Sequence, residues 1–332
     1  LELATRFHRK LTRSSITVLK DDSLTLPFHH IEEKRFLVLT IGESLPSFTE
    51  TLSYYAPIKV DHLLIDKQRG LDKVNSDIWE AYNSLIVVVG NTNLDSVPHT
   101  KFLQKLEKAG LEKEITIINF EQTQNLRLLE SFQTLVQAYN HLPVTQEIMA
   151  QVLFGGEAAE GKLPQQISNK IALGQGIQTQ VNRLAYTSPE VLGIDSYDLS
   201  PLAAIAEEAI REQAIPGCKV LGAKAGSIIY NEAFGYHTYD SLRQVNTTDL
   251  YDIASITKIA ATTLSGMKLY EERKLNLRAP LGNYFKDNHL RVDTTGISAI
   301  RYAMDTIPLK DFEAATNVSI LPIHTQQTIS QA

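Results

Sequence analysis

Residues that build covalent or metal cross-links are scarce in this chain. Among its 332 residues there is one cysteine, Cys218. A lone cysteine forms no internal disulfide and offers no partners for a zinc site, so cysteine usage does not indicate a redox compartment. We interpret Cys218 as a small buried side chain at the start of a strand. The 9 histidines are scattered, and only His29 and His30 are neighbours, so the sequence predicts no metal site and no other cofactor.

Long hydrophobic runs and a surplus of positive charge are also missing. The longest apolar runs, Leu85–Val89 and Ile115–Phe120, are far shorter than the roughly 18 residues that a membrane span requires. Lysine and arginine number 32 against 38 acidic residues, which gives a formal net charge of −6, and no basic stripe stands out. The sequence therefore predicts no membrane span and argues against nucleic acid as the main partner.

The chain begins at Leu1, with no initiator methionine and with neither the basic nor the apolar segment of a signal peptide. We therefore expect it to be a piece of a longer protein. At about 150 residues per domain, its length predicts two domains. With 43% apolar residues, each half has enough material for a core.

The first half alternates short β-branched runs with longer amphipathic runs, a pattern typical of an open, mainly parallel sheet covered by helices on both faces. The predicted strands are Phe36–Ile41, Val60–Ile65, Leu85–Val89, Ile115–Asn119 and Thr134–Tyr139, and the predicted helices are Ser47–Tyr55, Lys73–Ala81, Asp95–Ala109 and Val144–Leu153. We expect right-handed crossovers to place these helices on alternate faces of the sheet.

The pattern changes near residue 190. From Gly155 to about Glu190 the chain is rich in Gly, Gln, Asn and Ser and has little periodicity, which indicates an interdomain connection. Beyond it, Pro201–Gln213 is predicted to be an amphipathic helix. Lys219–Ala225 and Ser227–Phe234 are predicted to form a hairpin with a tight turn at Gly226. A second fold is therefore expected to begin here.

One glycine-rich run imitates a phosphate-binding loop. Gly156-Glu-Ala-Ala-Glu-Gly161-Lys162 has the required spacing, but Leu163 replaces the Ser or Thr that would hold magnesium. In a phosphate-binding loop a strand precedes the glycine-rich run and a helix follows it. Here Pro164 blocks the following helix, and a predicted helix takes the place of the preceding strand. We interpret the run as a helix-terminating glycine turn.

The segment Tyr251-Asp-Ile-Ala-Ser255-Ile-Thr-Lys258 carries the strongest chemical signal. It precedes a predicted helical run, Ile259–Glu272. Residues three apart share a helix face, so the side chains of Ser255 and Lys258 can meet. A lysine near a helix N-terminus and partly desolvated loses its proton more easily, and backbone amides at the helix start can stabilise an oxyanion. The pattern therefore predicts a nucleophile, a base and a charge stabiliser within one turn.

Spacing alone is weak evidence, since about one SxxK match is expected by chance in a chain of this composition. A second match, Ser265 and Lys268, falls inside the predicted helix. The backbone amide of Ser265 is already used by the helix ladder, so we interpret that pair as a surface face.

Each half of the chain also resembles a known family. From Arg9 to Leu26, followed by Pro27, the chain resembles the start of the C-terminal α/β sandwich domain of glycoside hydrolase family 3. The run Leu153-Phe-Gly-Gly-Glu-Ala-Ala-Glu-Gly-Lys-Leu-Pro164 resembles the end of that domain. In this family the nucleophilic aspartate lies in an N-terminal barrel, which is not in this chain, so no glycosidase catalytic residue is assigned here.

From about Ser196 onward the chain is similar to class C serine β-lactamases and related penicillin-binding proteins and esterases. The similarity is carried by Ile215-Pro-Gly217, by Tyr251–Lys258 and by Leu269-Tyr-Glu-Glu-Arg-Lys-Leu-Asn-Leu-Arg-Ala-Pro-Leu281. It implies that Ser255 is the acyl-enzyme nucleophile and Lys258 its general base. The family's later Tyr-x-Asn or Ser-x-Asn element and its Lys/His-Ser/Thr-Gly strand have no match after Lys258, and Thr294-Thr-Gly296 stands at the wrong place.

Together the resemblances imply an α/β open, mainly parallel sheet sandwich domain followed by an incomplete α+β serine β-lactamase-like domain. The implied boundaries are residues 1–170 for the sandwich, 171–195 for a linker, 196–290 for the N-terminal part of the hydrolase domain and 291–332 for a divergent tail.

The function these resemblances imply is that of a bacterial hydrolase fragment. It would combine a family 3 glycosidase of β-N-acetylhexosaminidase or β-glucosidase type with a serine acyl-enzyme hydrolase, act on a carbohydrate or a peptidoglycan-derived substrate, and be exported to the periplasm or cell envelope. Because each active site lacks members that act as a unit, we expect little turnover from this chain alone. The alternative is a noncatalytic carbohydrate-associated scaffold or binding module.

Overall fold

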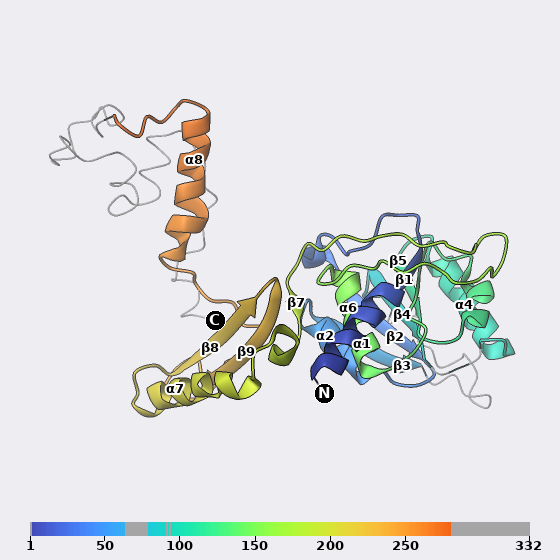
Figure 1. Cartoon of the computed structure of the whole chain (residues 1–332), viewed down its shortest axis with the longest axis horizontal. Helices are drawn as coiled ribbons and strands as arrows, with labels where there is room; N and C mark the ends of the chain where they lie inside the picture. Colours follow the sequence, from blue (N-terminus) through green and yellow to red (C-terminus); the bar gives the residue numbers. More distant parts are fainter. Residues whose placement is uncertain (1, 64–78, 91, 93, 280–332) are drawn as a thin grey trace. The chain divides into compact units, whose positions relative to one another are not determined.

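The computed structural model of the chain describes residues 2–63, 79–90, 92 and 94–279 (Figure 1). The chain divides into two compact units, Leu1–Thr248 and Asp249–Ala332. The tail predicted at residues 291–332, with its Thr294-Thr-Gly296 run, lies outside the described residues.

A six-stranded sheet forms the centre of the first unit. Its strands are β1 (Thr17–Asp21), β2 (Phe36–Ile41), β3 (Ile58–Leu63), β4 (Ser84–Val89), β5 (Glu114–Asn119) and β6 (Thr134–Gln137). Their order is β1-β6-β5-β4-β2-β3, and all pairs are parallel except β1 with β6. This order and pairing confirm the predicted open, mainly parallel α/β sheet. Runs of β-branched residues that are buried on both faces favour such a sheet.

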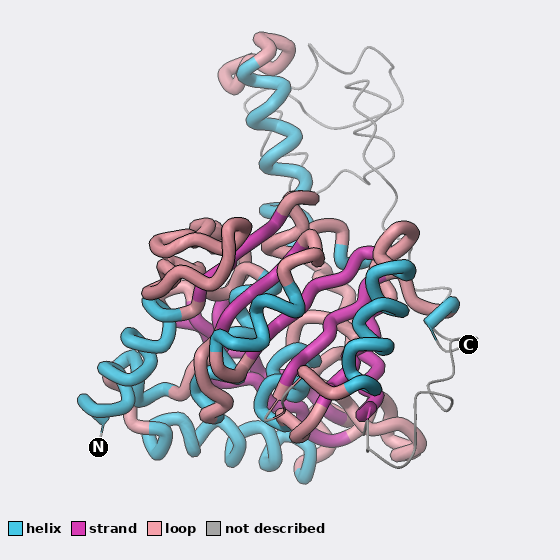
Figure 2. Tube along the Cα trace, turned by 90° about the vertical axis from the view of Figure 1, so that its right-hand side faces the viewer, coloured by secondary structure: helices cyan, strands magenta, loops and turns pink. Residues whose placement is uncertain are grey.

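Helices cover both faces of this sheet, and in Figure 2 the magenta strands run between cyan helices. The α-helices described within the first 154 residues are α1 (Glu2–Ser15), α2 (Pro46–Ser53), α4 (Val97–Ala109), α5 (Leu126–Leu129) and α6 (Pro143–Phe154). Side chains of β2 alternate between two cores: Phe36 and Val38 pack with α2 and α6, whereas Leu37 and Leu39 pack in the core that includes α4 and α5.

The beginning of the chain holds two elements that hydrophobic patterning did not predict. Helix α1 packs against α6. Strand β1 adds an antiparallel edge to the parallel sheet, with Thr17 opposite Gln137. Most of the predicted helix Lys73–Ala81 lies outside the described residues.

The segment after α6 is fixed to the first sheet by hydrogen bonds. Helix α6 ends at Gly155, which adopts a left-handed conformation with φ 77°. The Gly161 amide donates to the Ile16 carbonyl at 2.9 Å, and Ile177 forms a bridge with Val18. Arg183 donates to the Phe154 carbonyl at 2.6 Å. The glycine run that imitates a phosphate loop therefore follows a helix and is a structural turn, as interpreted from the sequence.

A second, three-stranded sheet follows this segment within the first unit. Its strands are β7 (Ala185–Tyr186), β8 (Gly217–Lys224) and β9 (Ser227–Gly235), in the order β7-β9-β8. The predicted hairpin is confirmed, with Gly226 at φ 78° in the turn. Helix α7 (Ser200–Arg211) packs against β8 and β9. Cys218 is free and stands near the start of β8, but it is only partly buried.

The described residues of this unit also contain short 3-10 helices: η1 (Ile31–Glu33), η3 (Thr123–Asn125), η4 (Pro189–Leu192) and η5 (Ser196–Leu199). The described part of the second unit contains a π-helix, η6 (Lys258–Thr263), continued by α8 (Leu264–Glu271). None of the helices among the described residues has the length and apolar content needed to cross a bilayer.

Replacing Gly161 tests how the segment after α6 is fixed. A Cβ at this position would clash with the backbone carbonyl oxygens of Ser15 and Ile16, which cannot move without disturbing β1. We expect Gly161→Ala to lower the free energy of unfolding by about 2 kcal/mol or more, measured by urea titration. The control is Gly110→Ala, where the nearest atom to an added Cβ is 3.4 Å away. An equal loss in both variants would contradict the prediction.

Candidate functional site

The predicted catalytic pair lies at the start of the helix in the second unit. The Lys258 amide donates to the Ser255 carbonyl at 3.1 Å, so the two residues stand one turn apart, as their spacing predicts. Ser255 and Lys258 are both exposed, so the expected partial desolvation of the lysine is wrong, and the structure describes no hydrogen bond between their side chains. Ala254 precedes the serine with φ 42°, a left-handed conformation that few non-glycine residues adopt. The backbone is therefore strained at the position that presents Ser255.

The helix after Ser255 differs from the predicted α-helical run Ile259–Glu272. It begins as a π-helix over Lys258–Thr263 and becomes α-helical only from Leu264. The Thr263 hydroxyl donates to the Lys258 carbonyl at 2.8 Å, across five residues. π-Helical turns are rare and occur frequently at functional sites.

The second SxxK match has the surface character predicted for it. Ser265 lies inside α8. The Lys268 ammonium is 3.7 Å from Glu271 and 3.6 Å from Glu272, in exposed ion pairs that lie three and four residues along the helix. Such pairs are typical of a solvated helix face.

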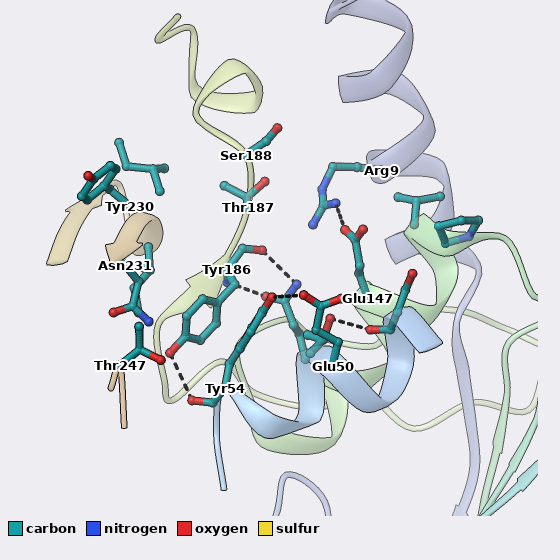
Figure 3. Close-up of a pocket in the computed structure, with 17 residues that line it drawn as sticks. Arg9, Glu50, Tyr54, Glu147, Tyr186, Thr187, Ser188, Tyr230, Asn231 and Thr247 are labelled. Atoms are coloured by element: carbon teal, nitrogen blue, oxygen red, sulfur yellow. Dashed lines mark hydrogen bonds and ion pairs between the residues drawn. The ribbon is translucent and has the colours of Figure 1, made fainter. Parts of the chain in front are cut away.

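A cavity of about 760 Å³ lies within the first unit (Figure 3). Side chains from α1, α2, α6, β9 and the segment 186–188 line it. Figure 3 shows Arg9 and Glu147 on one side, Tyr230 and Asn231 on the other, and Tyr54 and Tyr186 between them. The walls thus come from chain segments that are far apart in the sequence.

Charged and phenolic groups are paired on the helical wall of the cavity. The Arg9 guanidinium donates to the Glu147 carboxylate at 2.6 Å, and the Arg9 side chain is 11% exposed. The Tyr54 hydroxyl donates to the Glu50 carboxylate at 2.9 Å. Burial, followed by this hydrogen bond and the Glu50 charge, raises the pKa of Tyr54 to about 12. Tyr54 therefore stays protonated at neutral pH and acts as a hydrogen-bond donor.

Gln151 connects this wall to the second sheet. Its side-chain oxygen accepts from the Tyr186 amide at 2.7 Å, and its side-chain nitrogen donates to the Tyr186 carbonyl at 3.0 Å. The Tyr186 ring lies against Tyr54 at 4.8 Å and Tyr55 at 5.2 Å between centroids. Burial raises the pKa of both Tyr186 and Tyr55. The tyrosines near β7 are thus neutral, closely packed aromatic groups.

Sequence reasoning missed every residue of this cavity. Its lining runs from Arg9 to Thr247, and no local motif marks it. The described residues also bring His30, Glu32 and Glu33 together, with ligand atoms within 4.8 Å of one another. All three side chains are exposed on one short turn, and this acidic cluster is not assigned as a metal site.

Comparison with known families gives a match to part of the second half of the chain. Residues 202–303 match the beta-lactamase family. The beta-lactamase-like segment begins in α7, includes the hairpin β8–β9 and contains both Ser255 and Lys258. The expected similarity to serine β-lactamases from about Ser196 onward is therefore confirmed.

Curated relatives match the chain over 34% of its length. Protein flp of Staphylococcus aureus strain NCTC 8325 / PS 47 is 31% identical over 113 residues, and the match covers 21% of that protein. The protein of the same name in strain COL gives the same values: 31% identity over 113 residues, covering 34% of this chain and 21% of the relative. The match thus covers about a fifth of the length of these relatives.

Solved structures similar to the chain include glycoside hydrolase family 3 enzymes. The fungal multi-domain β-N-acetylglucosaminidase has a TM-score of 0.42 at 14% identity and covers 70% of this chain and 28% of its own. The β-N-acetylglucosaminidase from Paenibacillus sp. str. FPU-7 has a TM-score of 0.41 at 18% identity, and the match covers 48% of this chain and 32% of that enzyme. The β-glucosidase from Listeria innocua has a TM-score of 0.39 at 15% identity, and the match covers 46% of this chain and 26% of that enzyme. Similarity at this level does not assign an activity.

The pairing of Tyr54 with Glu50 predicts how that tyrosine titrates. A carboxylate that accepts from the phenol favours its protonated form and repels the phenolate, so removing the charge should favour ionisation. We expect Glu50→Gln to lower the pKa of Tyr54 from about 12 toward its usual value of 10, followed by NMR of ring-labelled tyrosine. Glu232→Gln, which removes a carboxylate that accepts a hydrogen bond from Tyr230, should leave the pKa of Tyr54 unchanged. A Tyr54 pKa that stays near 12 in Glu50→Gln would exclude this role for Glu50.

Proposed function

We propose that the chain is part of a serine hydrolase that works through an acyl-enzyme, with Ser255 as nucleophile and Lys258 as general base. The observation that carries this proposal is the position of the pair: the SxxK turn opens a helix inside the segment that matches the beta-lactamase family. The strained Ala254 and the π-helical start of η6 support a functional rather than a purely structural turn.

The chemistry follows from the two side chains. The Ser255 oxygen attacks a carbonyl carbon while its proton passes to the Lys258 amine, and the carbonyl electrons move onto the carbonyl oxygen. Backbone amides at the helix start stabilise that oxyanion. The intermediate collapses with loss of an amine or alcohol, which takes the proton from Lys258. Water then hydrolyses the Ser255 ester and releases the acid.

The wider role of the parent protein is also a proposal. The resemblance of residues 1–170 to the family 3 sandwich supports a partner domain for a glycosidase of β-N-acetylhexosaminidase or β-glucosidase type. It also supports a carbohydrate or peptidoglycan-derived substrate and a location outside the cytoplasm. We propose that the present chain alone has little turnover, because residues that act together in catalysis lose most of their effect when one is missing.

Covalent labelling tests the assignment of Ser255. In the protein made from the complete reading frame that contains this chain, we expect a fluorophosphonate or an acylating β-lactam to label Ser255. Ser255→Ala should reduce labelling by about 10³-fold or more, because no other group supplies the nucleophile. Intact-protein and peptide mass spectrometry would measure both the extent and the position of the adduct.

The chain contains a matched control for this experiment. Ser265→Ala removes the serine of the second SxxK match, whose lysine is held by Glu271 and Glu272, and should leave labelling unchanged. Lys258→Ala should slow labelling while the Ser255 site is retained. Equal labelling of Ser255→Ala and the unsubstituted protein would overturn the proposal and favour the noncatalytic module.

A further inference from the structure

An exposed carboxylate lies three residues before Ser255 and binds the backbone of the turn that presents it. Asp252 Oδ1 accepts from the Ala254 amide at 2.7 Å. Aspartate side chains bind a backbone amide two residues along the chain in many turns, and such a bond orients the peptide group that it contacts. Here that peptide group joins Ile253 to Ala254, the residue with φ 42°. Asp252 therefore acts on the backbone at the strained position.

Hydrogen bonds hold both peptide groups that flank Ala254. The group before it is held twice, because its amide donates to Asp252 and its carbonyl, which belongs to Ile253, accepts from the Ile256 amide at 2.9 Å. The group after it is held because the Ala254 carbonyl accepts from the Thr257 amide at 3.1 Å. Since peptide groups are planar, the orientation of one relative to the other sets φ and ψ of the residue between them. These bonds together hold Ala254 in the left-handed conformation.

The bond from Asp252 differs from the others because it comes from a side chain. Asp252 is exposed, so shortening its side chain leaves no cavity in a core. The bonds from Ile256 and Thr257 belong to the backbone, and substitution does not remove them. A variant at Asp252 therefore changes the support of Ala254 with little effect on packing.

The amide of Ser255 is directed by the same turn. Among the described residues it donates to no group, whereas the amides of Ile256, Thr257 and Lys258 each donate to the carbonyl three residues back. The conformation of Ala254 sets the direction of the Ser255 amide, which belongs to the peptide group that follows Ala254. It also directs the start of the Ser255 side chain. An unpaired amide beside the attacking oxygen can bind the charge that develops during acylation.

We propose that Asp252 is a positioning residue for Ser255: by binding the Ala254 amide, its carboxylate keeps the turn in the conformation that presents the hydroxyl and amide of Ser255. Asp252 acts through the backbone and not on the substrate, so it is required as a hydrogen-bond acceptor and not as a charge. This inference rests on the proposed acyl-enzyme function of Ser255.

Rates of covalent labelling test the proposal in the protein made from the complete reading frame. The quantity measured is the second-order rate constant for labelling of Ser255 by a fluorophosphonate, followed by intact-protein mass spectrometry. Asp252→Ala should lower this constant about tenfold, the effect of losing one hydrogen bond of ordinary strength. Asp252→Asn should react at nearly the rate of the unsubstituted protein, because the amide oxygen of asparagine accepts the same bond without the charge.

Glycine at position 254 separates a positioning role from a general loss of structure. Glycine adopts positive φ without steric cost, so a turn that contains it needs less support. Ala254→Gly introduced together with Asp252→Ala should therefore recover part of the lost rate. The matched control is Asp195→Ala, because Asp195 Oδ1 accepts from the Tyr197 amide at 2.9 Å in a similar turn of the first unit. That variant should label at the unsubstituted rate.

The possible failures of the two proposals are distinguishable. Labelling of Ser255 at an unchanged rate in Asp252→Ala would overturn the role of Asp252 and leave the acyl-enzyme proposal standing. An Asp252→Asn variant as slow as Asp252→Ala would also overturn it, since the charge would then matter. A double variant without recovery would do the same by indicating a loss of structure. Absence of labelling at Ser255 in the unsubstituted protein would overturn both proposals.

Discussion

The side chain of Gln151 pairs with the edge of β7 that no strand covers, and it connects the two sheets of the first unit. The amides of Ala185 and Thr187 donate to β9 and its turn, so the amide and carbonyl of Tyr186 point the other way. Gln151, which is 1% exposed, satisfies both through one donated and one accepted hydrogen bond. Because Gln151 belongs to α6, this pair of bonds ties the second sheet to the helical layer of the first.

The cavity is a consequence of the same arrangement. Residues 186–188, at the end of β7, line the cavity. Residues of α1, α2 and α6 form one wall and residues of β9 form the other. The Tyr186 hydroxyl donates to the Tyr54 carbonyl at 3.1 Å, which holds the ring between the two walls.

How much could be predicted from the sequence depends on the distance over which each feature is encoded. The strands β2, β4 and β5 are runs of β-branched residues, and the Ser255–Lys258 pair lies within one turn, so local patterns identify them. Strand β7 has two residues and no alternation, and its pairing with β9 arises from contacts that only the fold creates. The cavity could not be predicted for the same reason: Arg9 and Asn231 are 222 positions apart in the chain, and no motif includes both.

Hydrogen–deuterium exchange of the Gln151→Leu variant tests most directly whether Gln151 joins the two sheets. Leucine keeps the size of the buried side chain but cannot pair with Tyr186. We expect the backbone amides of residues 185–187 to lose protection, while the amides of β2 and β4 keep theirs. Unchanged protection at residues 185–187 would contradict this role of Gln151, and so would an equal loss throughout the six-stranded sheet, which would indicate general destabilisation instead of a broken connection.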